Sequence, residues 1–152
     1  MKHKKIVFVC TGNTCRSPMA ELIFKKLVQE RGVRDRFSID SCATSGYEVG
    51  NPVYPPALRT LRAHGVEGNH TARRITPRDL AQNDYVLVMD EENLRAVNRL
   101  AQANERGKIR KLCSFTDRPR DVADPWYTGD FERAYADIRE GCAAFLDFVL
   151  QD

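Results

Sequence analysis

The sequence contains no apolar run that approaches the roughly 20 residues needed to cross a bilayer. Residues 1–5 are largely basic, but only the short apolar run Ile6-Val7-Phe8-Val9 follows them, so they do not match a secretory signal peptide. No internal repeat, linker or low-complexity segment interrupts the chain. We therefore expect a cytoplasmic protein with no membrane partner, and one domain over residues 1–152 that is large enough to bury a core.

Cysteine and histidine are too few and too irregularly spaced for two common kinds of site. Five cysteines are an odd number, and they do not form the dense pattern of a small disulfide-bonded domain. Cys10 and Cys15 lack the Cys-x2-Cys spacing, and no His-x3-His pair accompanies them, so we expect no metal site. We interpret the other three cysteines as small apolar core residues in a reducing compartment: Cys42, Cys113 and Cys142.

Charge of one sign is also scarce. The chain has 24 Lys and Arg residues against 21 Asp and Glu residues, which gives a formal net charge of +3. The basic residues are scattered and do not alternate with aromatic residues, so the sequence does not predict a nucleic-acid-binding face. The mild positive charge is compatible with an anionic substrate, and we expect a monomer or weak self-association.

The most informative segment is Cys10-Thr11-Gly12-Asn13-Thr14-Cys15-Arg16-Ser17-Pro18, which directly follows the first apolar run. A turn between a strand and a helix N-terminus directs several backbone N–H groups at one point, and it therefore binds an oxyanion. Cys10 stands at the start of this turn, where the helix terminus and a nearby arginine favour a thiolate. The segment predicts a sulfur nucleophile beside a phosphate site, which suits phosphoryl transfer onto sulfur.

The residue types in this segment, which we call the phosphate loop (residues 10–17), each have a physical use. Gly12 and Asn13 tolerate the positive φ that a loop around a phosphate needs. Arg16 offers a planar fork of N–H donors that matches two phosphate oxygens. We expect Ser17 to cap the following helix, with Pro18 at its first position, and the Ser17 hydroxyl to reach the sulfur. The preceding strand makes this match more specific than a bare Cys-x5-Arg pattern, for which a buried structural cysteine is the alternative.

With these residues, the chain resembles the low-molecular-weight protein tyrosine phosphatase family. The resemblance lies in residues 9–18, in Asp124-Pro125-Trp126-Tyr127 near the end, and in their spacing, so it covers essentially the whole chain. It implies a phosphatase without metal or cofactor that hydrolyses phosphotyrosine and aryl phosphates through a phosphocysteine intermediate. It also implies that the phosphate is held by Thr11, Gly12, Asn13, Thr14, Cys15, Arg16 and Ser17.

The segment before the last predicted helix offers an acid for such a mechanism. Asp124 precedes Pro125, which favours an extended backbone, and the aromatic residues Trp126 and Tyr127 can stack on a phenyl ring. On spacing alone, an Asp-Pro turn in a surface loop is an equal alternative; the resemblance makes Asp124 the general acid. We interpret the two rival acids of this segment as solvated side chains: Asp117 and Asp121.

The resemblance also implies a supporting hydrogen-bond network that keeps the phosphate loop in shape, formed by Asn13, Ser17, Ser41 and His70. From its residue type alone, His70 would be an ordinary surface or core histidine. Asp90 is expected to pair with Arg16, to cap its own helix, or to do both.

Tyr47 and Trp126, together with Tyr127, are expected to form the mouth of the substrate pocket. They lie in loops rather than on a periodic stripe, and a deep aromatic slot would admit phosphotyrosine while leaving phosphoserine too short to reach the sulfur. Cys15 matches a second family cysteine that forms a reversible disulfide with the nucleophile, which would spare it from overoxidation. A packing role for Cys15 is the alternative.

Two other functions share several of these features. A thiol-dependent arsenate reductase has the same fold and loop, but it needs further redox cysteines, and the strand that ends at Asp90 carries none. A catalytically silent phosphate-binding module would tolerate the loss of Cys10 or Asp124, and both are present. We therefore predict a phosphatase whose partner is a phosphotyrosine protein.

Alternating periodicities predict the fold. We expect strands at residues 5–9, 37–41, 84–89 and 108–112, and helices at 17–31, 56–64, 76–81, from Asp90 to about Asn104, and from Phe131 to the end, with a long loop over 114–129. This alternation predicts a single three-layer α/β domain, with a four-stranded parallel sheet in the order 2-1-3-4 and helices on both faces. Ligands bind beyond the carboxyl ends of such strands, where Cys10, Ser41, Asp90 and the long loop would converge.

Overall fold

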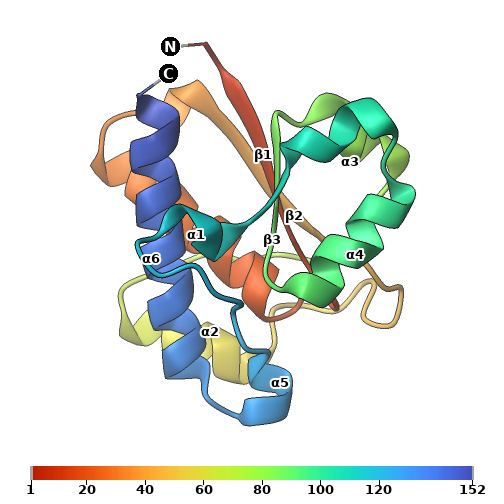
Figure 1. The fold of residues 1–152 in the computed structure, drawn as a ribbon. Helices are drawn as coiled ribbons and strands as arrows, with labels where there is room; N and C mark the ends of the chain where they lie inside the picture. Colours follow the sequence, from red (N-terminus) through yellow and green to blue (C-terminus); the bar gives the residue numbers. More distant parts are fainter. Residues whose placement is uncertain (1, 152) are drawn as a thin grey trace.

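The computed structural model describes residues 2–151, and its strands and helices alternate as expected (Figure 1). The strands are β1 (Lys4–Cys10), β2 (Phe37–Ala43), β3 (Tyr85–Val88) and β4 (Ile109–Lys111). All strand pairs are parallel, and the order across the sheet is β2-β1-β3-β4. The predicted four-stranded parallel sheet is thus confirmed.

Helices cover both faces of this sheet. One face is covered by α1 (Arg16–Glu30), α2 (Pro55–Ala63) and α6 (Phe131–Leu150), and the other by α3 (Pro77–Gln82) and α4 (Glu91–Leu100) (Figure 1). Short helices complete the chain: α5 (Pro125–Thr128) and the 3-10 turns Arg34–Arg36, Ala103–Lys108 and Leu112–Phe115. No helix among residues 2–151 combines the length and the apolar composition that a membrane span requires.

The central strand β1 separates two hydrophobic cores. Ile6 and Phe8 pack on the side of α1 and α6, whereas Val7 and Val9 pack on the side of α3 and α4. All four side chains are fully buried, which explains why the strand reads as a continuous apolar run rather than an alternating one. Burial of each such side chain stabilises the fold by roughly 1.5–3 kcal/mol, so the strand is a firm base for the phosphate loop that follows it.

The start of α1 differs from the prediction. The helix begins at Arg16 with Cys15 in the cap position, so Ser17 and Pro18 are its second and third residues. Ser17 therefore does not cap the helix; its hydroxyl contacts Asn13 and Cys10 inside the loop instead. The helix thus begins two residues earlier than the Ser-Pro pair indicates, and the loop before it is correspondingly shorter.

Two further boundaries were wrong. Helix α4 ends at Leu100 rather than near Asn104, because the backbone becomes extended at Ala101 and the chain then forms a separate 3-10 turn. The long loop is not wholly irregular either, since it begins within a 3-10 turn and contains α5, whose cap residue is Asp124. Asp90 caps α4 as expected, by accepting a hydrogen bond from the Asn93 backbone N–H at 2.8 Å.

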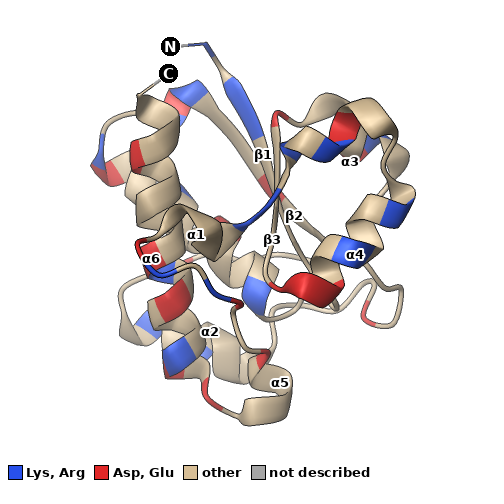
Figure 2. Cartoon of the chain, viewed as in Figure 1, with Lys and Arg blue, Asp and Glu red and all other residues tan. Residues whose placement is uncertain are grey.

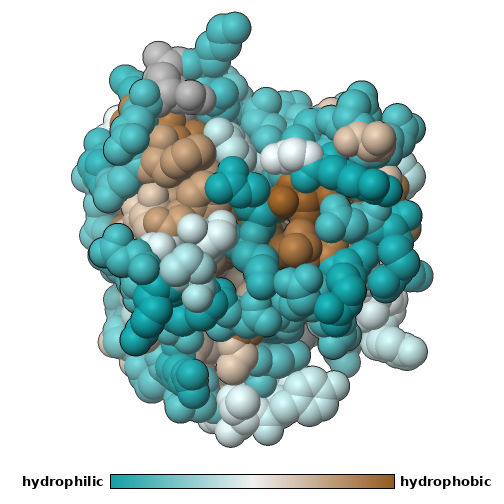
Figure 3. All heavy atoms as spheres, viewed as in Figure 1, coloured by the Kyte–Doolittle hydropathy of each residue, from teal (hydrophilic) through white to brown (hydrophobic). Residues whose placement is uncertain are grey.

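The surface carries both charge signs in alternation. Figure 2 shows Lys and Arg interspersed with Asp and Glu over the helices, with no extended basic stripe in this view. Figure 3 shows mainly hydrophilic residues on the same face, with hydrophobic residues gathered over the upper part of α6 and in a second patch between β3 and helices α3 and α4. Helix α6 has one large exposed hydrophobic residue there, Phe148, which packs on Phe115.

Candidate active site

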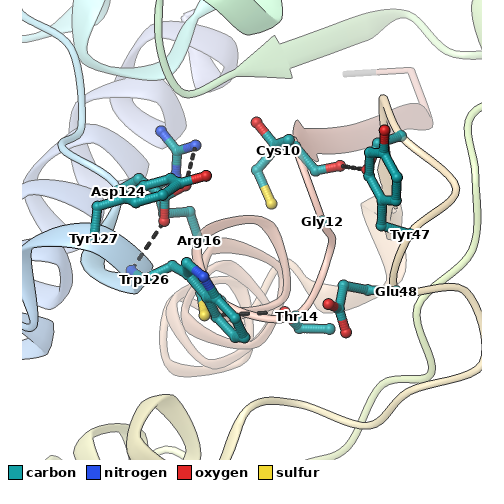
Figure 4. A pocket seen from close by; sticks show the side chains of 12 residues that line it. Cys10, Gly12, Thr14, Arg16, Tyr47, Glu48, Asp124, Trp126 and Tyr127 are labelled. Carbon is teal, nitrogen blue, oxygen red and sulfur yellow. Dashed lines mark hydrogen bonds and ion pairs between the residues drawn. The ribbon is translucent and has the colours of Figure 1, made fainter.

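A cavity of about 210 Å³ opens where the phosphate loop joins β1 to α1 (Figure 4). Three segments distant in sequence form its wall: the phosphate loop, the loop after β2, and the start of α5. The lining residues are Cys10, Thr11, Gly12, Thr14, Cys15, Arg16, Ser45, Tyr47, Glu48, Asp124, Trp126 and Tyr127. The cavity therefore lies at the carboxyl edge of the sheet, where ligands of parallel sheets bind.

The Cys10 sulfur lies at the inner end of the cavity and is contacted by two polar groups. The Asn13 backbone N–H donates to Sγ at 3.2 Å, and the Ser17 hydroxyl lies 2.9 Å from it. Ser17 Oγ accepts from Asn13 Nδ2 at 2.7 Å, so its own proton is left to donate, and the sulfur at 2.9 Å is nearer than the other acceptor, the Cys42 carbonyl at 3.5 Å. Two donors on one sulfur suit a thiolate nucleophile.

Arg16 is buried, and most of its donors are already used. Its Nη1 donates to Asp90 Oδ2 at 2.6 Å and to the Val122 carbonyl at 2.8 Å, and its Nη2 donates to Asp124 Oδ2 at 3.3 Å. Burial alone would lower the pKa of Arg16, but the negative charges of Cys10, Asp124 and Asp90 outweigh it and raise that pKa.

The remaining donors of Arg16 are its Nε–H and the second proton of Nη2, which make no hydrogen bond within residues 2–151. Nε and Nη2 form one edge of the guanidinium, and this edge matches two oxygens of a phosphate side-on. The Nη1 contacts with Asp90 and Val122 hold the cation in place, while the longer contact of Nη2 with Asp124, at 3.3 Å, is the only one on this edge among residues 2–151.

Asp124 reaches the cavity from the start of α5. Its Oδ1 accepts the Trp126 backbone N–H at 3.1 Å, while Oδ2 faces Arg16, and the side chain is partly exposed (Figure 4). Of the two rival acids, Asp117 is exposed, and Asp121 is exposed but paired with Lys111 at 3.0 Å. Neither lines the cavity among the described residues.

The cavity mouth is aromatic and open to solvent. Tyr47 is 92% exposed and Tyr127 is 84% exposed, whereas Trp126 is 50% exposed and packs on Tyr54 with ring centroids 4.7 Å apart. Besides Asp124, the mouth has one more acidic residue among the described residues, Glu48, whose carboxylate accepts a hydrogen bond from the Asn51 side chain. The structure thus brings together the three aromatic residues that the sequence analysis placed at the pocket.

Behind the loop, Asn13 is fully hydrogen-bonded. It is the one non-glycine residue with positive φ among residues 2–151 (60°), a conformation that costs an L-residue roughly 1–2 kcal/mol. Its Nδ2 donates to Ser17 Oγ at 2.7 Å and to Ser41 Oγ at 3.0 Å, and its Oδ1 accepts from His70 Nε2 at 2.7 Å and from the Arg73 backbone N–H at 3.1 Å. These bonds offset the backbone strain.

These contacts also show which ring nitrogen of His70 carries a proton. The Arg73 backbone N–H can only donate, so the atom it meets is the Asn13 amide oxygen, and His70 Nε2 must donate to the same oxygen. The other ring nitrogen, Nδ1, lies 3.1 Å from the carboxylate of Glu21. His70 Nε2 therefore carries a proton, and the ring is held between Asn13 and Glu21.

Glu21 is a buried member of this network that the sequence analysis missed. Its carboxylate accepts from Ser41 Oγ at 2.6 Å and from Lys25 Nζ at 2.6 Å, besides its contact with His70. Burial would raise the pKa of Glu21, but the hydrogen bonds from His70, Lys25 and Ser41 outweigh it and lower that pKa. In sequence, Glu21 and Lys25 look like an ordinary exposed i,i+4 pair, which hides the role of Glu21.

Asn93 was also missed, although a signal for it exists. It is buried in the first turn of α4, where its Oδ1 accepts the Met89 N–H at 3.3 Å and its Nδ2 donates to Thr11 Oγ1 at 3.1 Å. A polar residue three positions after the Asp90 cap faces back toward the strand end. Asn93 thereby links the third strand to the phosphate loop.

The cysteines are all buried and unpaired among the described residues. Cys15 lines the cavity beside Cys10, and its burial together with the negative charge of Cys10 raises its pKa to about 12. Cys42, Cys113 and Cys142 lie in the cores, which confirms their interpretation as apolar core residues.

Comparison with known proteins assigns this α/β fold and its phosphate loop to a class of phosphatases. Residues 5–152 match the family model described as low molecular weight phosphotyrosine protein phosphatase. The chain is 45% identical to the Mus musculus low molecular weight phosphotyrosine protein phosphatase over 149 residues, which covers 95% of this chain and 94% of the relative.

Solved structures agree with this match. YfkJ from Bacillus subtilis is similar with a TM-score of 0.94 and 34% identity, over 99% of this chain and 97% of that one. A Drosophila arginine phosphatase is similar with a TM-score of 0.88 and 35% identity, over 98% of each chain. The chain belongs to the low-molecular-weight protein tyrosine phosphatase family, and it is a phosphatase.

Proposed function

We propose that this enzyme hydrolyses phosphotyrosine in proteins without a metal, and that Cys10, Arg16 and Asp124 carry out the chemistry. One observation supports this proposal above all others. The Cys10 sulfur, held by two donors, shares a cavity with the Nε–Nη2 edge of the Arg16 guanidinium and with the Asp124 carboxyl group. Nucleophile, anion receptor and acid therefore converge on one ligand position.

The first step transfers the phosphoryl group onto sulfur. The substrate dianion is held by the backbone N–H groups of the loop and by the Nε and Nη2 donors of Arg16. The Cys10 thiolate attacks phosphorus in line, so that the S–P bond forms while the P–O bond to the phenol breaks. Asp124, as a carboxylic acid, donates its proton to the departing oxygen.

The second step releases the phosphate. The Asp124 carboxylate takes a proton from water while the water oxygen attacks phosphorus and the S–P bond breaks, which regenerates the thiolate and the acid. The bonds that Arg16 makes with Asp90 and with the Val122 carbonyl keep the guanidinium in place through both steps. The contact between Arg16 and Asp124 is the one that an incoming phosphate would compete with.

The aromatic mouth supports an aryl ester as substrate. Tyr47 and Trp126 offer flat apolar surfaces that line the same cavity as the phosphate loop, and the mouse and human relatives are both named phosphotyrosine protein phosphatases. A second candidate substrate is phosphorylated arginine, because the similar Drosophila structure is titled an arginine phosphatase. Glu48 at the mouth favours this candidate, since a carboxylate can pair with a guanidinium.

Peptides that carry either phosphorylated residue in the same sequence test the proposal. We expect release of inorganic phosphate from the phosphotyrosine peptide, no turnover by Cys10→Ser, and unchanged turnover in a metal chelator. Faster turnover of the phosphoarginine peptide would make the second candidate the function. Reduction of arsenate by a thiol donor, with no phosphate release from either peptide, would contradict both.

We also propose that the enzyme is cytoplasmic and monomeric or weakly self-associating, and that Cys15 protects Cys10 from overoxidation. The position of Cys15 in the same cavity supports a reversible disulfide between the two. After brief peroxide treatment, a dithiol should restore the activity of the wild type but not of Cys15→Ser. Equal, irreversible loss in both proteins would remove this role.

A further inference from the structure

Arg73, whose backbone N–H donates to the amide oxygen of Asn13, has a side chain that forms an ion cluster outside the cavity. The Arg73 guanidinium donates to both carboxylate oxygens of Asp79, each at 2.9 Å. On its other side it donates to Asp40 Oδ2, from Nε at 3.1 Å and from Nη2 at 2.9 Å. We call Asp40, Arg73 and Asp79 the arginine clamp.

The clamp joins three parts of the fold. Asp40 lies in β2 and Asp79 lies in α3, while Arg73 belongs to the segment between α2 and α3. The hydrogen bond to Asp79 raises the pKa of Arg73. Burial alone would raise the pKa of Asp79, but its hydrogen bonds from Arg73 and Thr76 outweigh burial and lower that pKa, so both groups stay charged at neutral pH. A planar guanidinium with a carboxylate on each edge has little rotational freedom.

The backbone of Arg73 continues from the clamp toward the nucleophile. Its carbonyl accepts the Ala43 N–H at 2.8 Å, which adds the segment to the edge of β2, and its own N–H donates to Asn13 Oδ1. Asn13 in turn places its backbone N–H on the Cys10 sulfur at 3.2 Å. Only two hydrogen bonds therefore separate the Arg73 backbone from the attacking atom.

We infer that Arg73 is a positioning residue for phosphoryl transfer: its clamp on Asp40 and Asp79 fixes the N–H that holds Asn13 in its left-handed conformation. None of the three clamp residues lines the cavity among residues 2–151, so their effect on catalysis passes through Asn13. This inference rests on the proposed function, because it concerns the rate of the sulfur attack. The Arg73 N–H is thus the second donor to the Asn13 amide oxygen, besides His70 Nε2.

The chain contains a matched control for this arrangement. Arg120 also bridges two carboxylates, since it donates to Asp137 Oδ1 at 2.9 Å and to Glu140 Oε2 at 2.7 Å. Like Arg73 it is partly exposed, but its two carboxylate partners lie on α6 and its other partners, Thr116 and Arg118, lie in its own segment. Among the described residues it makes no hydrogen bond or ion pair with the phosphate loop. Substitution of Arg120 therefore measures how much kcat changes when a surface ion cluster that does not contact the phosphate loop is lost.

The test compares Arg73→Met with Arg120→Met. We expect Arg73→Met to lower kcat on an aryl phosphate about tenfold, because small displacements of reacting groups have effects of this size, while Arg120→Met stays within about twofold of the wild type. Arg73→Lys should fall between them, since an ammonium cannot pair with both carboxylates in the same plane. Equal kcat values for Arg73→Met and Arg120→Met would overturn the inference.

Two readouts separate positioning from stability and from the proposed function. The Asn13 backbone amide resonance, which reports the N–H on sulfur, should shift in Arg73→Met and stay in place in Arg120→Met, whether or not the enzyme turns over phosphotyrosine. Asp40→Asn should lower kcat in the wild type but not further in Arg73→Met, because both act through one cluster. An unmoved Asn13 resonance, or additive kcat losses, would show that the clamp does not position the loop.

Discussion

The inner end of the pocket and its mouth differ in how firmly their side chains are held. At the inner end, Asn13 uses all four of its hydrogen-bonding positions, and Arg16 is buried with three partners. At the mouth, Tyr47 and Tyr127 are almost fully exposed, and neither hydroxyl has a hydrogen-bond partner among the described residues. The same cavity therefore combines a rigid receptor with a loosely held rim.

This difference separates two tasks. Every phosphomonoester presents the same dianion to the inner end, so a preorganised receptor can stabilise the transition state for all of them. The group that carries the phosphate meets only the mouth, where side chains can change without disturbing the network behind them. Substitutions at the inner end should therefore change kcat, whereas substitutions at the mouth should change KM.

A substitution of Asp124 is the strongest test of this difference between the inner end and the mouth. Asp124 is close in sequence to the mouth residue Trp126, but its side chain contacts Arg16 at the inner end. Asp124→Asn should lower kcat by about 10² or more for phenyl phosphates with poor leaving groups, since general acids contribute about 10²–10⁴-fold. The loss should shrink for activated nitrophenyl esters, whose phenolate leaves without a proton. Steady-state rates over a series of substituted aryl phosphates measure this trend.

Trp126→Phe is the control for that series, because it keeps an aromatic ring next to Asp124 and leaves the acid intact. It should show the same slope against leaving-group pKa as the wild type. A uniform loss for Asp124→Asn over the whole series would remove Asp124 from the acid role and place it with the groups that only position Arg16.

Glu21 tests whether the rigid network extends beyond the loop. Glu21→Gln removes a buried charge that faces His70 and Lys25, so it should lower the free energy of unfolding by roughly 1–3 kcal/mol at pH 7 and reduce kcat several-fold. The pKa of Glu21 is lowered in the folded state, so this stabilisation is complete above the ordinary glutamate pKa, about 4.3, and is lost as the pH falls through the lowered value.

Urea unfolding at pH 7 and at successively lower pH measures that difference. The gap between the wild type and Glu21→Gln should narrow below about pH 4, because a glutamine does not titrate. Glu30→Gln is the matched control, since Glu30 lies at the exposed end of the same helix. A gap that stays constant with pH would mean that the Glu21 charge is not coupled to the fold.

The division also explains what the sequence could predict. The phosphate loop could be predicted from the sequence because its chemistry is local: one turn contains the thiol, the flexible residues and the guanidinium. The parallel sheet was readable from its alternating elements and its buried strands. Ser17 was misplaced by two positions because a Ser-Pro pair indicates a cap, whereas the Ser17 hydroxyl contacts the sulfur in this loop.

Residues that act through tertiary contacts were not readable. In the sequence, Glu21 looks like half of a surface pair with Lys25. Only the folded chain brings the distant His70 next to the Glu21 carboxylate. Arg73 and its two aspartates come from three separate elements, so no local pattern marks them. Residues that support the active site in this way can be identified only from the folded structure, because their spacing in the sequence follows no pattern.

Trp126 tests the mouth with a moderate effect. Its ring packs on Tyr54 and borders the cavity, so Trp126→Ala should raise KM for a phosphotyrosine peptide by about three- to tenfold, as expected for the loss of one aromatic contact of about 0.5–1.5 kcal/mol. Inhibition by inorganic phosphate, which meets only the inner end, should stay within twofold of the wild type. A parallel loss of phosphate affinity would show that the mouth and the inner end are not independent.

Tyr127 should give the smallest effect and therefore the most sensitive test of a loosely held mouth. Its side chain is 84% exposed, so Tyr127→Ala should change the free energy of unfolding by less than about 0.5 kcal/mol. KM should change less than in Trp126→Ala, and kcat should stay constant, because nothing in the network behind Arg16 touches this ring among residues 2–151. Thermal unfolding and peptide kinetics measure both quantities. A fall in kcat at constant KM would mean that the ring orders Asp124 through α5, which would extend the rigid inner end to the surface of the molecule.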